Sequence, residues 1–184
     1  MATVFDASDF FISQAQNNIN DTITNLRLNK LLFFAQAWCL SRYSKPLFSD
    51  DIEAWDFGPV IPAIYQKYKS NGKNNIDITS QNYTSNVFSG DELQVLIDVY
   101  NYYGRFSTTE LVDISHQEGG PWDMAYKQKK GSVISKDELR SYYKKNEPLK
   151  TFKLPMWMYE NTEDYSRTAS GIVKLTESWE EGDD

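Results

Sequence analysis

Apolar side chains recur at helical spacing along most of the chain, and this pattern predicts a mainly helical protein. Phe11, Ile12 and Ala15 share one face of a helix expected from Ser8 to about Asn17, with Ser8 as its N-cap. From residue 26 to about residue 43, the sequence LRLNKLLFFAQAWCLSRY contains neither glycine nor proline. Residues 31–40 are apolar on nearly every side, which is typical of a helix surrounded by other elements. We therefore predict a compact single-domain helical bundle around a central apolar helix at 26–43, with at most short strands.

Turn and capping residues mark the other elements. Gly58-Pro59 is expected to open a helix, because proline is tolerated in the first turn, and Asn71-Gly72 to stop it. Residues 50–55 can be read as either extended or helical, and residues 73–88 as a polar loop with one short strand at 76–78. A short helix is expected to begin at Pro121-Trp122. Three capping boxes predict helices at 90–103, 108–115 and 136–145: Ser89 with Glu92, Ser107 with Glu110, and Ser135 with Glu138.

Charge divides the chain into two parts. The net charge of the chain is -7. Residues 151–184 contain eight acidic and three basic residues and so contribute most of this negative charge. We expect residues 1–150 to form one domain and residues 151–184 an acidic, irregular C-terminal extension. An acidic chain without a basic stripe is poorly suited to bind nucleic acid by itself, and it favours a basic protein partner.

The reactive residue types are few. Cys39 is the single cysteine and His116 the single histidine, so an internal disulfide is excluded and the usual zinc ligand sets cannot be assembled. We expect no metal and no cofactor, and a buried, inert thiol at Cys39. Gln36 is a polar exception in the central helix and is expected to satisfy a buried backbone group. The N-terminus has no secretory pattern and no apolar run reaches the roughly twenty residues of a membrane span, which predicts a cytoplasmic protein without membrane contact.

Two aromatic Gly/Pro turns and one acid–base pair are the candidate functional features. Trp55 and Trp122 either pin their turns to the central helix or, if exposed, anchor a protein partner. His116 and Glu118 could act as an acid–base pair, but fixing a loop or capping a helix is the expected role of His116. A helix-turn-helix reading of residues 107–128 is disfavoured by the acidic side chains near its second helix.

Three sequence blocks resemble the Panacea domain, a SocA-like antitoxin family that also occurs in phage-associated proteins. They are LRLNKLLFFAQAW at 26–38, PLF at 46–48 with IEAWDFGPVIPAIY at 52–65, and ELVDISHQEGGPWDMAY at 110–126. The resemblance covers roughly residues 5–147. It implies a compact helical domain that neutralises a toxin by direct contact, and in one branch of the family also delivers the toxin to a protease as an adaptor.

Three hypotheses follow. The first is an antitoxin-like, non-enzymatic module that binds a protein toxin. The second is a phage or mobile-element protein that binds a host protein, such as a protease, a replication factor or a defence component. The third is an enzyme that uses His116 and Glu118. The candidate partner-binding residues are Trp55, Phe57, Gly58, Pro59, His116, Glu118 and Trp122.

Overall fold

The computed structural model describes residues 2–17, 21–76, 85–146, 166–167 and 173–174. Most of this part of the chain is helical, as the sequence predicts. The elements are α1 (Val4–Gln16), α2 (Asn25–Tyr43), β1 (Glu53–Trp55), β2 (Gly58–Val60), α3 (Pro62–Tyr68), η1 (Lys69–Asn71), η2 (Ser85–Val87), α4 (Gly90–Tyr103), α5 (Thr108–Ser115), α6 (Pro121–Gln128), α7 (Lys136–Asn146), β3 (Ser166–Arg167) and β4 (Val173–Lys174). β1 pairs antiparallel with β2, and β3 pairs antiparallel with β4.

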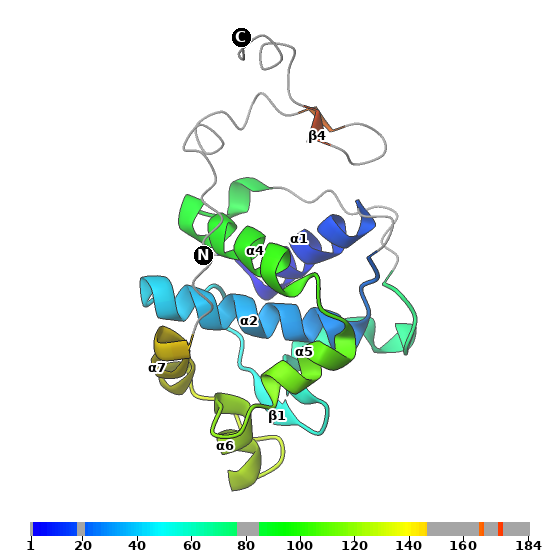
Figure 1. Ribbon diagram of the computed structural model, residues 1–184. Helices are drawn as coiled ribbons and strands as arrows, with labels where there is room; N and C mark the ends of the chain where they lie inside the picture. The colour runs from blue at the N-terminus through cyan, green and yellow to red at the C-terminus, as the bar shows by residue number, and fades with distance from the viewer. Residues whose placement is uncertain (1, 18–20, 77–84, 147–165, 168–172, 175–184) are drawn as a thin grey trace.

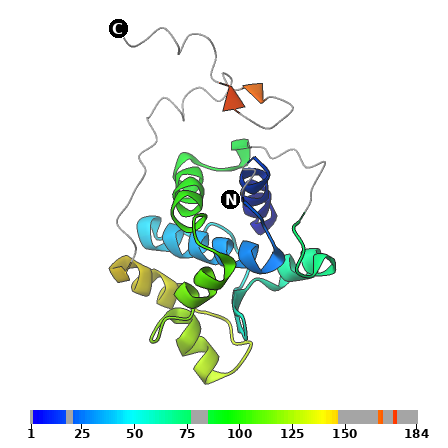
Figure 2. The same cartoon turned by 45° about the vertical axis from the view of Figure 1, so that its right-hand side comes forward.

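Helix α2 lies at the centre of the bundle. Helices α1 and α4 lie on one side of it, and α5, α6, α7 and the β1–β2 hairpin lie on the other (Figures 1 and 2). α2 contacts α1, α3, α4, α5, α7 and β2. Its neighbours bury every residue from Leu28 to Leu40, so the predicted central apolar helix is confirmed.

Aromatic side chains fill the core around α2. The rings of Phe34 and Tyr103 stack with a centroid distance of 3.8 Å, which joins α2 to α4. The ring centroids of Trp38 and Tyr103 are 5.5 Å apart. Beside it, a buried ion pair between Arg42 and Asp98 at 2.5 Å fixes the same two helices in register. The large apolar area that these rings remove from water is the main stabilising contribution of this side of the bundle.

The two polar or reactive side chains noted inside α2 behave as predicted. Gln36 is fully buried and satisfies the backbone of the loop that follows the helix. Its Oε1 accepts hydrogen bonds from the amides of Leu47 at 2.8 Å and Phe48 at 3.3 Å, and its Nε2 donates to the Phe48 carbonyl at 2.9 Å. Burial raises the pKa of the Cys39 thiol to about 12, so it stays protonated and unreactive.

Local capping chemistry sets the helix ends, with one correction. The capping boxes at Ser89 and Ser107 are confirmed, and at Ser135 the amide of Glu138 donates to the serine Oγ at 3.4 Å. The predicted start of the first helix at Ser8 is wrong. Thr3 forms a capping box with Asp6, and the helix begins at Val4. Ser8 is buried instead, with its hydroxyl 3.3 Å from the Tyr68 hydroxyl.

The helix predicted to open at Gly58-Pro59 is the second correction. Those residues form β2, which pairs with β1 and thereby settles the open reading of residues 50–55. α3 begins only at Pro62, whose ring occupies the first helical position. The strand expected at 76–78 has only Ile76 within the described residues, where no strand is assigned. The acidic extension lies almost entirely outside the described residues, and its separation from residues 1–150 stays a prediction.

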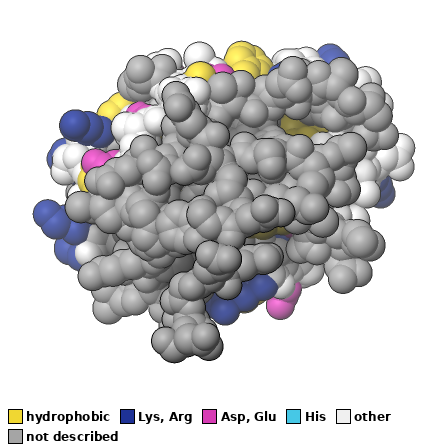
Figure 3. Space-filling model, turned by 90° about the horizontal axis from the view of Figure 1, so that it is seen from above, with side chains coloured by type: hydrophobic (Ala, Val, Ile, Leu, Met, Phe, Trp, Pro, Cys, Tyr) yellow, Lys and Arg dark blue, Asp and Glu magenta, His cyan; other side chains and the backbone are white. Residues whose placement is uncertain are grey.

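Figure 3 shows one face of the molecule, on which the described charged side chains stand in small groups. On the face seen from above, the described lysine and arginine side chains stand in separate clusters at the rim, some with acidic side chains beside them (Figure 3). Among the described helices, none is long and apolar enough to cross a membrane.

Candidate functional site

The β1–β2 hairpin is held along both of its edges. On the outer edge of β1, the amide of Ala54 donates to the Ser132 carbonyl at 2.9 Å, and the amide of Ile134 donates to the Ile52 carbonyl at 2.8 Å. In the part of the chain that the structure describes, β2 has no third strand beside it. Side chains from α2 bind backbone groups in β2 and directly after it instead. A hairpin of three-residue strands is marginal by itself, so these outside contacts stabilise it.

Lys30 of α2 binds the backbone of β2, and Asn29 binds the backbone of Ile61 directly after it. The Oδ1 atom of Asn29 accepts a hydrogen bond from the Ile61 amide at 2.8 Å, and the Nζ of Lys30 donates to the Pro59 carbonyl at 3.0 Å. Lys30 is 0% exposed. Burial lowers its pKa to about 7, because the interior disfavours the charged ammonium. Asn29 and Lys30 were not predicted as site residues from the sequence. The pattern that could have identified them is two adjacent polar side chains directly before the apolar run at 31–40.

Gly58 brings the hairpin backbone against Lys30 and His116. Its φ of +100° is a left-handed conformation that favours glycine. A Cβ at this position would lie 2.7 Å from Lys30 Cε and 3.0 Å from His116 Nε2, so a side chain has no room. The backbone turn and the two basic side chains therefore form one tightly packed unit.

His116 and Trp122 lock α5 and α6 onto this unit. Their rings stack at a centroid distance of 3.6 Å, and the Trp122 indole N–H donates to the Trp55 carbonyl at 3.0 Å. The pKa of His116 is lowered, first by burial and then by the charge of Lys30. Its Nε2 atom is buried and has no hydrogen-bond partner among the described residues. His116 is also the C-cap residue of α5, where its backbone N–H donates to the carbonyls of Val112 and Asp113.

The hairpin turn is fixed from the α6 side. Asp56 accepts hydrogen bonds from the Tyr126 hydroxyl at 2.8 Å and from Lys130 Nζ at 2.5 Å. These two donors hold the pKa of Asp56 below its ordinary value. The neighbouring turn residue, Phe57, points outward and is 71% exposed. An exposed phenyl ring on a rigid turn is a feature of protein-binding surfaces.

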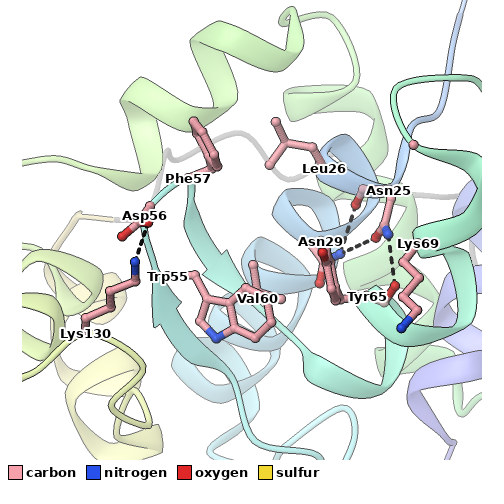
Figure 4. Close-up of a pocket in the computed structure, with 11 residues that line it drawn as sticks. Asn25, Leu26, Asn29, Trp55, Asp56, Phe57, Val60, Tyr65, Lys69 and Lys130 are labelled. Carbon is pink, nitrogen blue, oxygen red and sulfur yellow. Dashed lines mark hydrogen bonds and ion pairs between the residues drawn. The ribbon is translucent and has the colours of Figure 1, made fainter.

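An apolar pocket of about 430 Å³ opens beside Phe57. In Figure 4, Trp55 and Val60 lie on one side of it and Phe57 and Leu26 on the other, while Lys69 and Lys130 lie at opposite ends. Tyr65 packs edge-on against Trp55 with a centroid distance of 5.0 Å. The remaining lining residues are Asn25, Asn29, Asp56 and Gly72. We call these residues the hairpin pocket.

The polar atoms in the floor of the hairpin pocket are satisfied within the protein. Asn29 Nδ2 donates to both the carbonyl and the side-chain oxygen of Asn25 at 2.9 Å, and Asn25 Nδ2 donates to the Tyr65 carbonyl at 3.1 Å. With these groups already paired, the floor presents mainly apolar surface to a partner. The volume of the hairpin pocket lies within the roughly 300–1,000 Å³ that is usual for binding pockets.

The candidate residues fall into a buried and an accessible set. Gly58, Pro59 and Trp122 are buried, and Trp122 is only 7% exposed, which favours the structural alternative for this tryptophan. Phe57 and Glu118 are exposed, while Trp55 and His116 are half-buried. Neither His116 nor Glu118 lines the hairpin pocket.

Comparison with known proteins places the chain in a family. The family model described as antitoxin SocA-like, Panacea domain, matches residues 28–123. The chain belongs to the SocA-like Panacea family. The matched region runs from α2 to the start of α6, so Asn29, Lys30, the hairpin, His116 and Trp122 all lie within the Panacea domain.

A curated member of the family is antitoxin SocA of Caulobacter vibrioides (strain NA1000 / CB15N). It is 35% identical to this chain over an alignment of 115 residues, which covers 55% of this chain and 59% of the relative. The match therefore spans about three fifths of the relative's length. No solved structure matches the chain.

Proposed function

We propose that this Panacea protein is an antitoxin that neutralises a protein toxin by direct contact, and that the surface used is the exposed hairpin turn with the hairpin pocket beside it. Membership of an antitoxin family supports the class of partner. The observation that carries the choice of surface is the 71% exposed Phe57 beside an apolar pocket of about 430 Å³. A partner that covers this surface removes apolar area from water without unpairing any polar atom of the floor.

The rigidity of the hairpin supports a binding role. Its two edges are bonded to α2 and to residues 131–134, and Asp56 fixes its turn to α6. A turn held in this way loses little conformational entropy when a partner covers it, which favours affinity. Phe57 is therefore presented as a preformed anchor.

We further propose that the function is not catalytic. The half-buried His116 is stacked on Trp122 with its Nε2 enclosed, and Glu118 is exposed in the following turn. Lys30, whose lowered pKa is a property often found in catalytic lysines, is fully enclosed and donates to the Pro59 carbonyl. Ring stacking therefore accounts for the position of His116, and the Pro59 carbonyl accounts for that of Lys30.

Co-expression with the protein encoded by the adjacent gene tests the proposal. We expect that protein to stop growth, this chain to restore growth, and the two to copurify. Phe57→Ala should abolish rescue and copurification while the melting temperature stays unchanged, since the ring is largely exposed. Val87→Ala, which removes an apolar side chain 44% exposed outside the hairpin pocket, is the matched control and should still rescue.

Two results would contradict the proposal. If no adjacent gene product is toxic and rescued, a host protein takes the place of the toxin as partner. If Phe57→Ala rescues as well as the parent chain, the binding surface lies elsewhere. Rescue that persists in a strain lacking its ATP-dependent proteases would show that contact alone suffices, whereas rescue that requires a protease would assign the adaptor role.

A further inference from the structure

The hairpin pocket has an uneven charge distribution along its rim. Three charged residues line it, and two of them, Asp56 and Lys130, neutralise each other through their ion pair at 2.5 Å. Lys69 lies at the other end of the pocket and is exposed. Among the described residues, its ammonium group has no hydrogen bond and no ion pair. Among the residues that the structure describes, one positive charge without an ionic partner therefore stands at a single end of an apolar pocket.

The chain around Lys69 strengthens this positive end. Residues 57–76 contain three lysines and no acidic residue, although the whole chain has a net charge of -7. Lys67 is already engaged, 3.9 Å from the Asp9 carboxylate and over the rings of Phe5 and Tyr68. Lys69 and the exposed Lys73 are left to interact with a partner. This stretch is therefore locally basic within a chain that is acidic overall.

We infer that the hairpin pocket receives an acidic-flanked apolar segment of the toxin: a large apolar side chain enters between Trp55 and Phe57, and a neighbouring carboxylate binds Lys69. The inference rests on the proposed function and names the chemistry of the segment recognised. The apolar floor buries the apolar side chain of the toxin segment. Lys69 sets the direction in which the segment binds, because a carboxylate can form an ion pair at only one end of the pocket. The overall acidity of the chain can still attract a basic region elsewhere on the same toxin.

A peptide selection tests the chemistry without the toxin itself. A random peptide library displayed on phage is panned against the full chain, and the selected peptides are synthesised and titrated by fluorescence anisotropy. We expect selected sequences to combine a Trp, Phe, Leu or Met with Asp or Glu nearby. Their affinity should fall about tenfold in Lys69→Glu, as a reversed partly exposed charge pair predicts, and should weaken with added salt.

Matched variants separate the charge effect from general acidity. Lys45→Glu makes the same change of charge just beyond the C-terminal end of α2, whereas the pocket lies at its N-terminal end, and should bind as the parent chain does. Phe57→Ala should weaken every selected peptide regardless of its charge. Selection of neutral or basic peptides, or equal binding to Lys69→Glu and the parent chain, would overturn the inference.

Two further outcomes identify other occupants. Residues 152–164 of this chain read FKLPMWMYENTED and share the expected composition. If selected peptides match that sequence and the synthetic segment binds the pocket, the chain's own extension replaces the toxin as occupant and the inference is overturned. If Phe57→Ala no longer rescues growth from the toxin but Lys69→Glu rescues it fully, the proposed function is supported and the inference of an acidic partner segment is overturned.

Discussion

Replacing Lys30 with methionine tests the reasoning about the centre of the hairpin site. The change keeps the length of the apolar stem and removes a group whose pKa falls from 10.5 to about 7 on folding. Between these two pH values the unfolded chain binds more protons than the folded chain. The lysine contribution to the free energy of unfolding therefore rises with pH through this window and is lowest below pH 7.

The magnitude follows from the size of the shift. Each pKa unit corresponds to about 1.4 kcal/mol, so Lys30 changes the free energy of unfolding by about 5 kcal/mol across its window. The difference between the parent chain and Lys30→Met should rise by up to about 1.4 kcal/mol for each pH unit above neutrality. Urea unfolding followed by tryptophan fluorescence, from about pH 7.5 to about pH 10 at constant ionic strength, measures this slope.

A surface lysine provides the control. Lys45 is exposed, and Lys45→Met should give a stability curve parallel to that of the parent chain over the same pH range. The other titrating groups are common to all three proteins and cancel in the differences, except His116, whose pKa Lys30 lowers and which titrates below this pH range. Parallel curves for Lys30→Met and the parent chain would refute the argument, because they would mean that the Lys30 ammonium is not desolvated by folding.

Two further substitutions test the contacts around α2. Gly58→Ala should destabilise the fold by about 2–5 kcal/mol, from a left-handed backbone and an overlap with Lys30, whereas Gly72→Ala, at φ +57° with no atom within 4 Å, should lose only about 1–2 kcal/mol. Equal losses, measured by urea unfolding, would contradict the predicted overlap. Gln36→Leu should cost about 2–5 kcal/mol by leaving backbone groups of Leu47 and Phe48 unpaired; a calorimetric melting temperature unchanged from the parent would contradict that role.

Much of the helical architecture could be predicted from sequence because its signals are local. The capping boxes at Ser89 and Ser107 satisfy amides only three residues away, so short sequence patterns suffice to find them. The apolar run in α2 required burial on all sides whatever the neighbours were. The burial of Cys39 and Gln36 was predicted correctly for the same reason, since both residues lie in that run.

The hairpin site could not be predicted because its stability comes from residues distant in sequence. Pro59 has the same local preferences at the start of a helix as in an edge strand. What selects the strand is that Lys30, Asn29 and residues 131–134 supply partners for the hairpin backbone. The exposure of Phe57 and the burial of Trp122 depend on the same contacts.

The mainly helical fold, the central helix and most helix ends follow from local sequence patterns, because periodicity and capping act within a few residues. Three features became visible only in the folded chain: Gly58-Pro59 lies in a strand, Lys30 is buried beneath it, and Phe57 and Lys69 flank an apolar pocket. Backbone pairing, desolvation and pocket shape could not be predicted because each depends on which distant segments pack together.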